Sequence, residues 1–388
     1  MWPAWAIGIA LALLLSLVTG AQTSQFLFDR WQKASLRAIP ATNLRVVLID
    51  DKSLAFIGPW PWSRYYLARL TEDIARDGAK VIGYDVLFPE PDRAKPELFA
   101  KLYPELSPSA SSEVSALPSM DQVFGQVIGR SPVVIARAGA SEGVRDGRSL
   151  AVDATITGSL PIRIDTWPAA ITAIPEIEDV ALGHGLVNDQ PDPDGTIRSV
   201  PLIMRVAGKP MPGLALELAR LDLGSDGVRT YRDHVDLSRR QIPIDQRGRM
   251  HLRFGKFPTP NIVSAAAILG KGLPRGYFRN KIVLVGLAAE GTSDIVSTPI
   301  ASENFGVIVQ AEAVDTILAG GWLARPQWMA ALEWGLALAM ALLALASAWS
   351  GKAPRIALAT AFVALPVAGW LAFDRLSLLL DAVRPFEI

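Results

Sequence analysis

The chain has 388 residues, half of them hydrophobic, with 38 basic and 38 acidic side chains and therefore no formal net charge. A protein without a basic excess lacks the field that draws in a phosphate backbone, so we expect no nucleic-acid partner. The sequence contains no cysteine, which excludes disulfides and thiolate metal sites.

Apolar segments at the two ends of the chain predict membrane helices. Residues 2–21 carry no charge and would span roughly 30 Å as one helix. Residues 327–349 and 354–373 predict two more spans, and Glu333 lies inside the first of these. Residues 22–326 hold nearly all the charge and are long enough for one large domain or two small ones.

The first apolar segment also has a feature of a cleaved signal peptide, because Thr19, Gly20 and Ala21 are small residues near a possible cleavage point. It lacks the basic region that usually precedes such a peptide, so we favour an uncleaved anchor. Small residues recur at every fourth position of this segment and of the second, which favours close helix packing and a homodimer through the membrane helices. Ala-rich helices also produce this spacing by chance. The positions are Ala4, Gly8, Ala12, Ser16, Gly20, Ala331, Gly335 and Ala339.

The side of the membrane on which the large domain lies is not decided by charge. Basic residues are more numerous after the first apolar segment than in the short loop before residue 354, which by simple counting places the domain inside. Long domains, however, cross membranes largely regardless of charge. Several of these basic residues also lie in 26–39, whose pattern predicts an interfacial helix.

The first part of the large domain predicts a βαβ unit. Residues 44–50 form a strand, Ser63 caps a helix that Gly78 ends, and residues 79–86 form the next strand. We expect the two strands to be parallel neighbours with a right-handed crossover. Residues 93–119 are rich in Pro and Ser and predict a surface insertion, and residues 133–136 predict a short strand.

The second part predicts a hairpin, a helix, a strand and a final helix. Two strand-like runs flank the Asp-Pro-Asp-Gly turn at 192–195. A helix is expected over 214–221, the last strand over 281–286, and a helix from Gly306 toward the membrane. Together these elements predict an α/β fold with a partly parallel sheet, flanked by membrane helices.

Motifs of familiar active sites fail on particular residues. Residues 286–293 nearly match a phosphate-binding loop, but Thr292 stands where the essential lysine belongs. Residues 190–195 resemble the start of a calcium loop, but Gln190 occupies the first ligand position, which excludes an EF-hand and leaves a looser cation contact open. The three histidines lack zinc-protease spacing, and no nucleophile elbow occurs.

Acidic and aromatic residues mark the most distinctive stretch, residues 46–92. Asp50 and Asp51 follow one predicted strand and Asp85 lies near the end of the next, where open α/β sheets bind ligands. Such carboxylates suit Mg²⁺, Ca²⁺, an amine or a hydroxyl-rich solute. The competing interpretation is structural: helix caps, a pair of Asp85 with backbone amides or Arg64, and core tryptophans. The candidate ligand contacts are Asp50, Asp51, Trp60, Trp62, Arg64, Asp85, Asp92 and Asp294, and Glu90 is a further acid of this group.

A series of segments in order resembles the type 2 CHASE domain, the cyclase and histidine kinase associated extracellular sensory module of bacteria. The segments are VVLIDDKSL, GPWPWSR, GAKVIGYDVLFPEPD, LVNDQPDPDGTIRSVPL, NKIVLVGLAAEGTSD, STPI and GVIVQAEAVDTIL. The resemblance spans residues 25–325 and implies a sensory domain outside the plasma membrane, connected by membrane helices to a cytoplasmic output domain of cyclase or kinase type. It transfers no catalytic residue and no cofactor to this chain.

The resemblance implies a multi-pass inner-membrane sensor with a large domain outside the cytoplasm and an unknown stimulus. With one anchor and two returning helices, residue 388 lies outside, so residues 376–388 are expected to approach a further span, before an output domain that this chain does not contain. Two other hypotheses stay open: a metal-dependent enzyme using Asp50, Asp51 and Asp85, and an envelope scaffold that binds another protein.

Overall fold

The computed structural model describes residues 23–39, 43–142, 154–289, 294–349 and 352–381. Within it the chain divides into two compact units. The larger unit is Ala38–Gly320, and the other is formed by the ends of the chain on either side of it. Each unit is described separately below.

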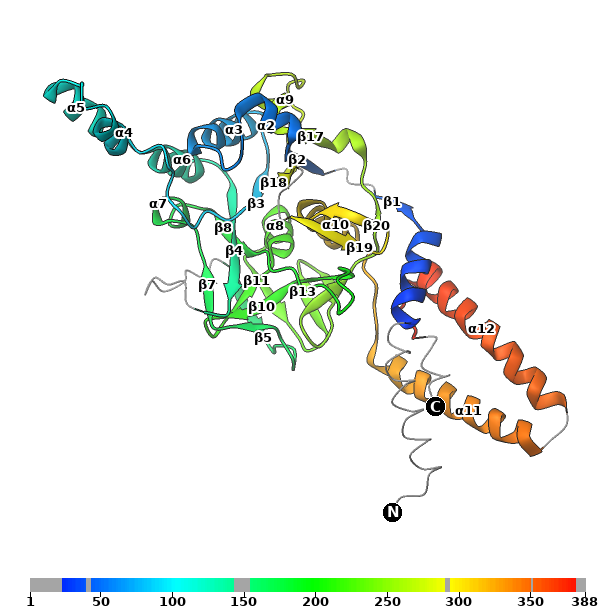
Figure 1. The fold of residues 1–388 in the computed structure, drawn as a ribbon. Helices are drawn as coiled ribbons and strands as arrows, with labels where there is room; N and C mark the ends of the chain where they lie inside the picture. The colour runs from blue at the N-terminus through cyan, green and yellow to red at the C-terminus, as the bar shows by residue number, and fades with distance from the viewer. Residues whose placement is uncertain (1–22, 40–42, 143–153, 290–293, 350–351, 382–388) are drawn as a thin grey trace, which may run out of the picture. The chain divides into compact units, whose positions relative to one another are not determined.

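The larger unit is built on one predominantly parallel sheet (Figure 1). All its strands run parallel to their neighbours except β7, which is antiparallel to β4. The predicted α/β class with a partly parallel sheet is therefore confirmed. In spatial order the strands are β17 (Ile262–Ser264), β2 (Leu44–Asp50), β18 (Ile282–Ala288), β3 (Val81–Asp85), β4 (Val133–Ala140) and β7 (Ala169–Ile171), with β8 (Gly183–Leu186) also paired to β4.

Helices cover both faces of this sheet. On one face lie α3 (Arg64–Arg76), α6 (Met120–Gly129) and α9 (Ala265–Leu269), which pack with alternate strand residues into the main hydrophobic core. On the other face lie α8 (Leu214–Asp222) and α10 (Gly306–Ala319), which also pack on each other. Glycines allow this close packing, because a Cβ at Gly286 would lie 2.5 Å from Val307 of α10. Helix α10 thus lies directly against the central strand β18.

The predicted strand and helix segments are largely confirmed, but the predicted neighbour of β2 is wrong. Strand β2 and helix α3 have the expected positions, with Ser63 accepting a hydrogen bond from Tyr65 N at the helix start. Strands β2 and β3 are not adjacent, because β18 lies between them and pairs with both. The pairing of β18 joins segments distant in the sequence, which a local pattern does not reveal.

The predicted hairpin around 192–195 is also wrong. Strand β8 enters the main sheet beside β4, whereas β9 (Ser199–Pro201) pairs with β15 (Arg249–His251). The turn between them is held by Arg198, whose guanidinium donates to Asp192 and Asp194 at 2.9 and 2.7 Å. Strand β18 is not the last strand either, since β19 (Ile295–Thr298) and β20 (Ala301–Phe305) form an antiparallel pair after it.

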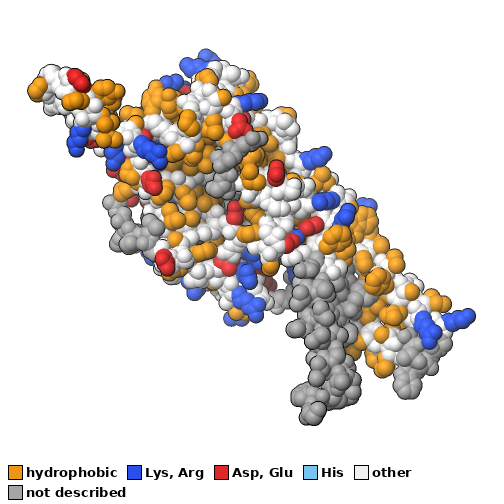
Figure 2. Space-filling model, viewed as in Figure 1, with side chains coloured by type: hydrophobic (Ala, Val, Ile, Leu, Met, Phe, Trp, Pro, Cys, Tyr) orange, Lys and Arg blue, Asp and Glu red, His pale blue; other side chains and the backbone are white. Residues whose placement is uncertain are grey.

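The predicted surface insertion lies on the surface, but it contains two helices. Helices α4 (Pro96–Leu102) and α5 (Pro108–Ser115) project from the rest of the larger unit (Figure 1). Apolar side chains are visible on this projection in Figure 2, and Leu98, Phe99 and Leu102 are exposed. Proline starts both helices at a position that needs no backbone donor, so its presence did not prevent helix formation.

Short elements complete the larger unit. One small sheet contains four strands: β5 (Thr155–Gly158), β12 (Gly227–Thr230), β13 (His234–Leu237) and β14 (Arg240–Pro243). Another contains three strands: β6 (Thr166–Trp167), β10 (Ile203–Val206) and β11 (Lys209–Pro212). Strand β1 (Arg37–Ala38) pairs with β16 (Gly255–Lys256). The remaining helices are α2 (Asp51–Ile57), α7 (Pro175–Glu178) and the 3₁₀ turn η1 (Thr259–Asn261).

The second unit contains the apolar helices. Helices α11 (Gln327–Trp349) and α12 (Lys352–Leu376) are long and apolar enough to span a membrane, by length and composition. Residues 23–34 form a helix whose Trp31 and Phe28 pack against Phe373 of α12. Glu333, fully buried in α11, accepts a 2.6 Å hydrogen bond from Arg325. The apolar segment 2–21 lies outside the described residues.

Candidate functional site

Three aspartates gather at the carboxyl ends of the parallel strands. Asp85 ends β3, Asp189 follows β8, and Asp294 follows β18. Asp85 occupies the same face of its strand as Gly83, which packs against α8. We call these three residues the acidic edge. They come from three strands of one sheet, in the position where open α/β sheets bind ligands.

Asp294 connects the acidic edge to α10. Its carboxylate accepts a hydrogen bond from the backbone N–H of Val307 in the first turn of α10, and its carbonyl accepts one from Gly306 N at 3.1 Å. Gly306 makes this approach possible, because a Cβ there would lie 2.7 Å from Asp294 Oδ1. The second carboxyl oxygen, Oδ2, is buried and has no hydrogen-bond partner in the described structure. The partial positive charge of the helix start favours an anion at this position.

Burial and like charge both act on the acidic edge. Burial raises the pKa of Asp294 to about 7, and the nearby carboxylate of Asp189 contributes to the rise. Burial also raises the pKa of Asp85 well above its usual range, with further contributions from Asp294 and Asp189. Asp189 itself lies at the exposed rim. The charge of Asp189 therefore favours protonation of Asp85 and Asp294, and a cation arriving here would relieve the repulsion.

The acidic edge is not arranged as a ready metal centre. No group of three or more His, Asp or Glu residues in the described part of the chain is placed to hold a metal ion. No ion pair with Lys or Arg neutralises these three carboxyls within that part either. The arrangement is suited to binding a donor or a positive charge and to responding to protonation.

Asp92 and Arg64 belong to a different cluster, whose hydrogen bonds described below involve none of the three residues of the acidic edge. Asp92 Oδ2 accepts from Arg64 N at 2.6 Å and from Ser63 Oγ at 2.8 Å, while Asp92 N donates to Asp121. The Arg64 guanidinium lies 4.8 Å from the centre of the Phe88 ring and donates to the Glu90 carbonyl. Burial lowers the pKa of Arg64, against the raising effect of Asp121, Asp92 and Glu90. This cluster fastens the loop after β3 to the starts of α3 and α6.

Asp50 and Asp51 also do not belong to the acidic edge, because the side chain of Asp50 is bonded to other groups and Asp51 is exposed. Asp50 caps α2, because Oδ1 accepts from Ser53 N at 3.0 Å, and it also accepts from the hydroxyls of Ser53 and Ser264 at 2.7 and 2.6 Å. Ser264 in turn caps α9. Asp51 is the first residue of α2 and is exposed. Asp50 thus joins two helix starts to the strand β2.

The two tryptophans pack with the core of the same region. Trp62 is buried and donates from Nε1 to the Gly58 carbonyl at 2.9 Å. Trp60 is partly buried, with its ring centre 5.7 Å from that of Trp62 in an edge-on arrangement. Of the eight residues predicted as ligand contacts, only Asp85 and Asp294 therefore belong to the acidic edge. Arg64 bonds to Asp92 and Trp60 packs on Trp62 in the clusters described above.

The acids that the sequence did not predict include Asp189 and Glu312. Asp189 follows β8, and a correct placement of that strand beside β4 would have marked it by the rule that also marks Asp85. Glu312 lies in the apolar helix α10 and is buried. The available signal was an acid within a mainly apolar helix, because a buried acid usually has a partner.

The family model of the CHASE2 domain matches residues 6–349, which is most of the chain. The match includes the whole larger unit and helix α11. Comparisons with curated proteins and with solved structures gave no match.

Proposed function

We propose that this chain, which belongs to the CHASE2 family of extracellular sensory domains of signalling receptors, is the membrane-anchored input module of such a receptor. The larger unit detects an envelope or extracellular stimulus, and the apolar helices pass the response toward a cytoplasmic output domain of cyclase or kinase type.

The single observation that carries the relay is the position of α10. Its first turn is bonded to Asp294 of the acidic edge, and the chain continues from its last residue, Ala319, to the apolar helix α11 at Gln327. A ligand or proton that changes the charge of Asp294 changes the interaction with the start of α10. That helix is buried between β18 and α8, so we expect any displacement to involve the whole packed helix.

The energy available for signalling is bounded. A stimulus shifts the balance between two arrangements only by its difference in affinity for them, typically about 1–3 kcal/mol. A charge at a helix start is worth on the order of 0.3–1 kcal/mol, or up to about 2 kcal/mol when partly buried. Protonation of Asp294 therefore supplies energy of the required size.

A cyclase chimera tests this function. The full chain, followed by one additional membrane helix and a cytoplasmic adenylate cyclase domain, is expressed in a bacterium that lacks its own cyclase. Asp294→Asn keeps an acceptor for Val307 N–H and removes the charge. We expect it to change cyclic AMP several-fold, as a shift of about 1 kcal/mol requires.

The matched control is Asp51→Asn, an equal charge change at an exposed helix start. It should leave cyclic AMP at the wild-type level. Equal output from the wild type, both variants and the cyclase without the sensory chain, at equal protein amounts, would contradict an input role.

We further propose that two copies associate through the membrane helices. Ala331, Gly335 and Ala339 lie on an exposed side of α11, and a Cβ at Gly335 meets no atom within 4 Å of its own chain. Small residues let a second helix approach closely. Gly335→Leu should therefore reduce crosslinking between copies in membranes, whereas Ala344→Leu, at an exposed position on the opposite side of α11, should leave it unchanged. Equal crosslinking in Gly335→Leu and wild type would contradict an interface at this stripe.

A further inference from the structure

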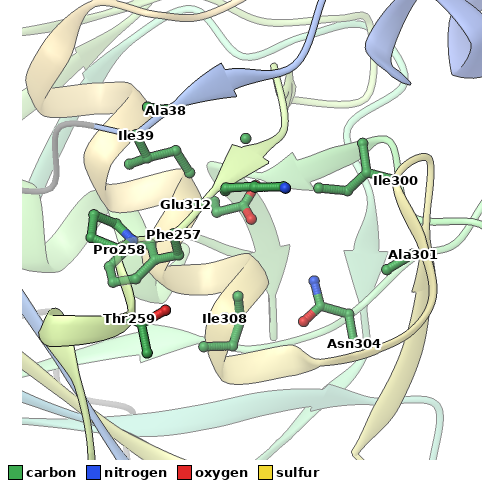
Figure 3. Close-up of a pocket in the computed structure, with 12 residues that line it drawn as sticks. Ala38, Ile39, Phe257, Pro258, Thr259, Ile300, Ala301, Asn304, Ile308 and Glu312 are labelled. Carbon is green, nitrogen blue, oxygen red and sulfur yellow. The ribbon is translucent and has the colours of Figure 1, made fainter. Parts of the chain in front are cut away.

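A cavity of about 520 Å³ opens in the larger unit beside α10 (Figure 3). Its size falls in the range of small-molecule sites. Figure 3 places Glu312 among the labelled residues, with Ile39, Phe257 and Pro258 on one side and Ile300, Ala301 and Asn304 on the other. The walls are mostly apolar, and Asn304 and Thr259 add an amide and a hydroxyl.

Glu312 is the buried polar group of this cavity. Its side chain belongs to a residue only 3% exposed, and its carboxylate accepts a hydrogen bond from Gly255 N–H. The second oxygen, Oε2, is buried and has no partner in the described structure. An unpaired buried acceptor is unfavourable, so a donor that reached it would be bound favourably.

The charged side chains near Glu312 do not neutralise its carboxylate. Asp315, on the same helix, repels it, and burial raises the pKa of Glu312 to about 8. Lys256 also lines the cavity, but it is exposed and forms no ion pair with Glu312. The cavity therefore offers one deep acceptor, apolar walls and no internal cation paired with that acceptor.

We propose that this cavity binds a primary amine with a short apolar body, whose ammonium group donates to Glu312 Oε2 while the hydrocarbon packs on Ile39, Phe257 and Ile308. An ammonium brings both a donor and the opposite charge, which an alcohol does not. A carboxylate ligand would be repelled by Glu312.

Residues from both ends of the larger unit line the cavity. Ala38 and Ile39 are its first residues, and Ile308 and Glu312 belong to its last helix, α10. A bound amine would therefore contact both segments through which the chain leaves this unit. This deepens the proposed function by naming a ligand class, and its meaning as a stimulus rests on that function. Binding itself does not depend on it.

Calorimetry on the full chain in nanodiscs tests the proposal, with empty nanodiscs as the blank. The probes are n-butylamine, n-butanol and butyrate at about pH 8.5, where an aliphatic amine is still largely protonated. We expect butylamine to bind with a Kd on the order of 1 mM, given its few atoms, and at least about tenfold more tightly than the other two. Absence of butylamine binding, or butanol or butyrate binding as tightly, would overturn the proposal.

Two variants locate the site. Glu312→Gln keeps the shape and the acceptor for Gly255 N–H, and it should weaken butylamine binding at least about tenfold. Ala301→Phe fills the cavity from β20 and leaves Glu312 in place, with the same expected loss. Glu303→Gln removes an exposed carboxylate from the same strand and should bind like wild type. Circular dichroism checks that each variant is folded, and unchanged binding by folded Glu312→Gln and Ala301→Phe would refute this site.

The pH dependence of butylamine binding provides a separate test. Because the ammonium binds the ionised carboxyl, a proton on Glu312 competes with it. The affinity of the wild type should fall by about tenfold for each pH unit below the pKa of Glu312. An affinity constant between about pH 8.5 and about pH 6 would contradict recognition by Glu312. A failed chimera with intact amine binding would count against the receptor function alone.

Discussion

Carboxylates with the same position relative to a strand have different tasks in this protein. Asp50 ends β2 and accepts hydrogen bonds from hydroxyl groups and from the backbone at a helix start, whereas Asp85 ends β3 close to other acids. The difference comes from their neighbours: Ser264 reaches Asp50 from β17, while Asp294 and Asp189 face Asp85. An acid that holds donors stabilises the fold when charged, and one that faces acids does so when neutral.

Asp92 should be a stabilising residue. Replacing Asp92 by alanine removes the acceptor of Arg64 N, Ser63 Oγ and Ala94 N, all of which bind at 2.8 Å or less. We expect a loss of about 2–4 kcal/mol in the free energy of unfolding, measured by denaturant unfolding of the purified chain. Asp51→Ala, at an exposed position, should cost less than about 1 kcal/mol. A stability of Asp92→Ala equal to or above that of wild type would argue for a ligand contact instead.

Asp294 should make stability fall as pH rises. Its pKa is about 7 in the folded state, above the ordinary value of 3.8, so the folded state holds the proton more tightly than the unfolded state. This contribution is complete below the unfolded pKa and is lost as pH rises through about 7.

Thermal unfolding of the full chain from about pH 5 to about pH 8 measures this dependence. Asp294→Asn should flatten it by on the order of 1 kcal/mol, less than the full shift because water screens a partly exposed carboxyl. An Asp294→Asn profile parallel to wild type would show that Asp294 does not titrate in this range.

The contact between β18 and α10 explains the near match to a phosphate-binding loop. Gly286 begins that sequence, and its Cα faces Val307 rather than an open anion site. Gly286→Ala places a methyl group 2.5 Å from the Val307 Cβ, inside a packed layer. We expect a loss of about 1–3 kcal/mol in unfolding free energy, read from denaturant midpoints.

Gly129→Ala provides the same chemical change in α6, where the new Cβ would meet Val180 at an ordinary 3.5 Å. It should be neutral or slightly stabilising, because alanine favours helix. If both variants unfolded at the same midpoint, the close approach of α10 to β18 would not be required.

Local patterns predicted the elements well and their arrangement poorly. Ser63 and the apolar period located α3, and the run of residues 44–50 located β2, because capping and burial act over a few residues. The insertion of β18 between β2 and β3 depends on a pairing across most of the domain, which no local signal contains. The acidic edge was therefore predicted only in part: Asp85 and Asp294 were identified, and Asp189 was missed with the placement of β8.

At the scale of the molecule, both proposed sensing features act on one helix. Asp294 bonds the first turn of α10, and Glu312 lies further along the same helix in the cavity wall. Helix α10 in turn precedes α11 in the chain. A charge change at either carboxyl therefore acts on the segment through which the sensory unit is connected to an apolar helix.

The topology of the proposed receptor is tested by cysteine labelling, for which the natural chain is suited because it has no cysteine. Ser112→Cys places a thiol at an exposed position of α5, and Lys352→Cys places one at the start of α12. With the sensory unit outside, a membrane-impermeant maleimide should label Ser112→Cys in intact cells. It should label Lys352→Cys only after permeabilisation, because α11 must cross the membrane before that residue. The reverse pattern would place the large domain in the cytoplasm, as a simple count of basic residues does, and would refute a sensor of external stimuli.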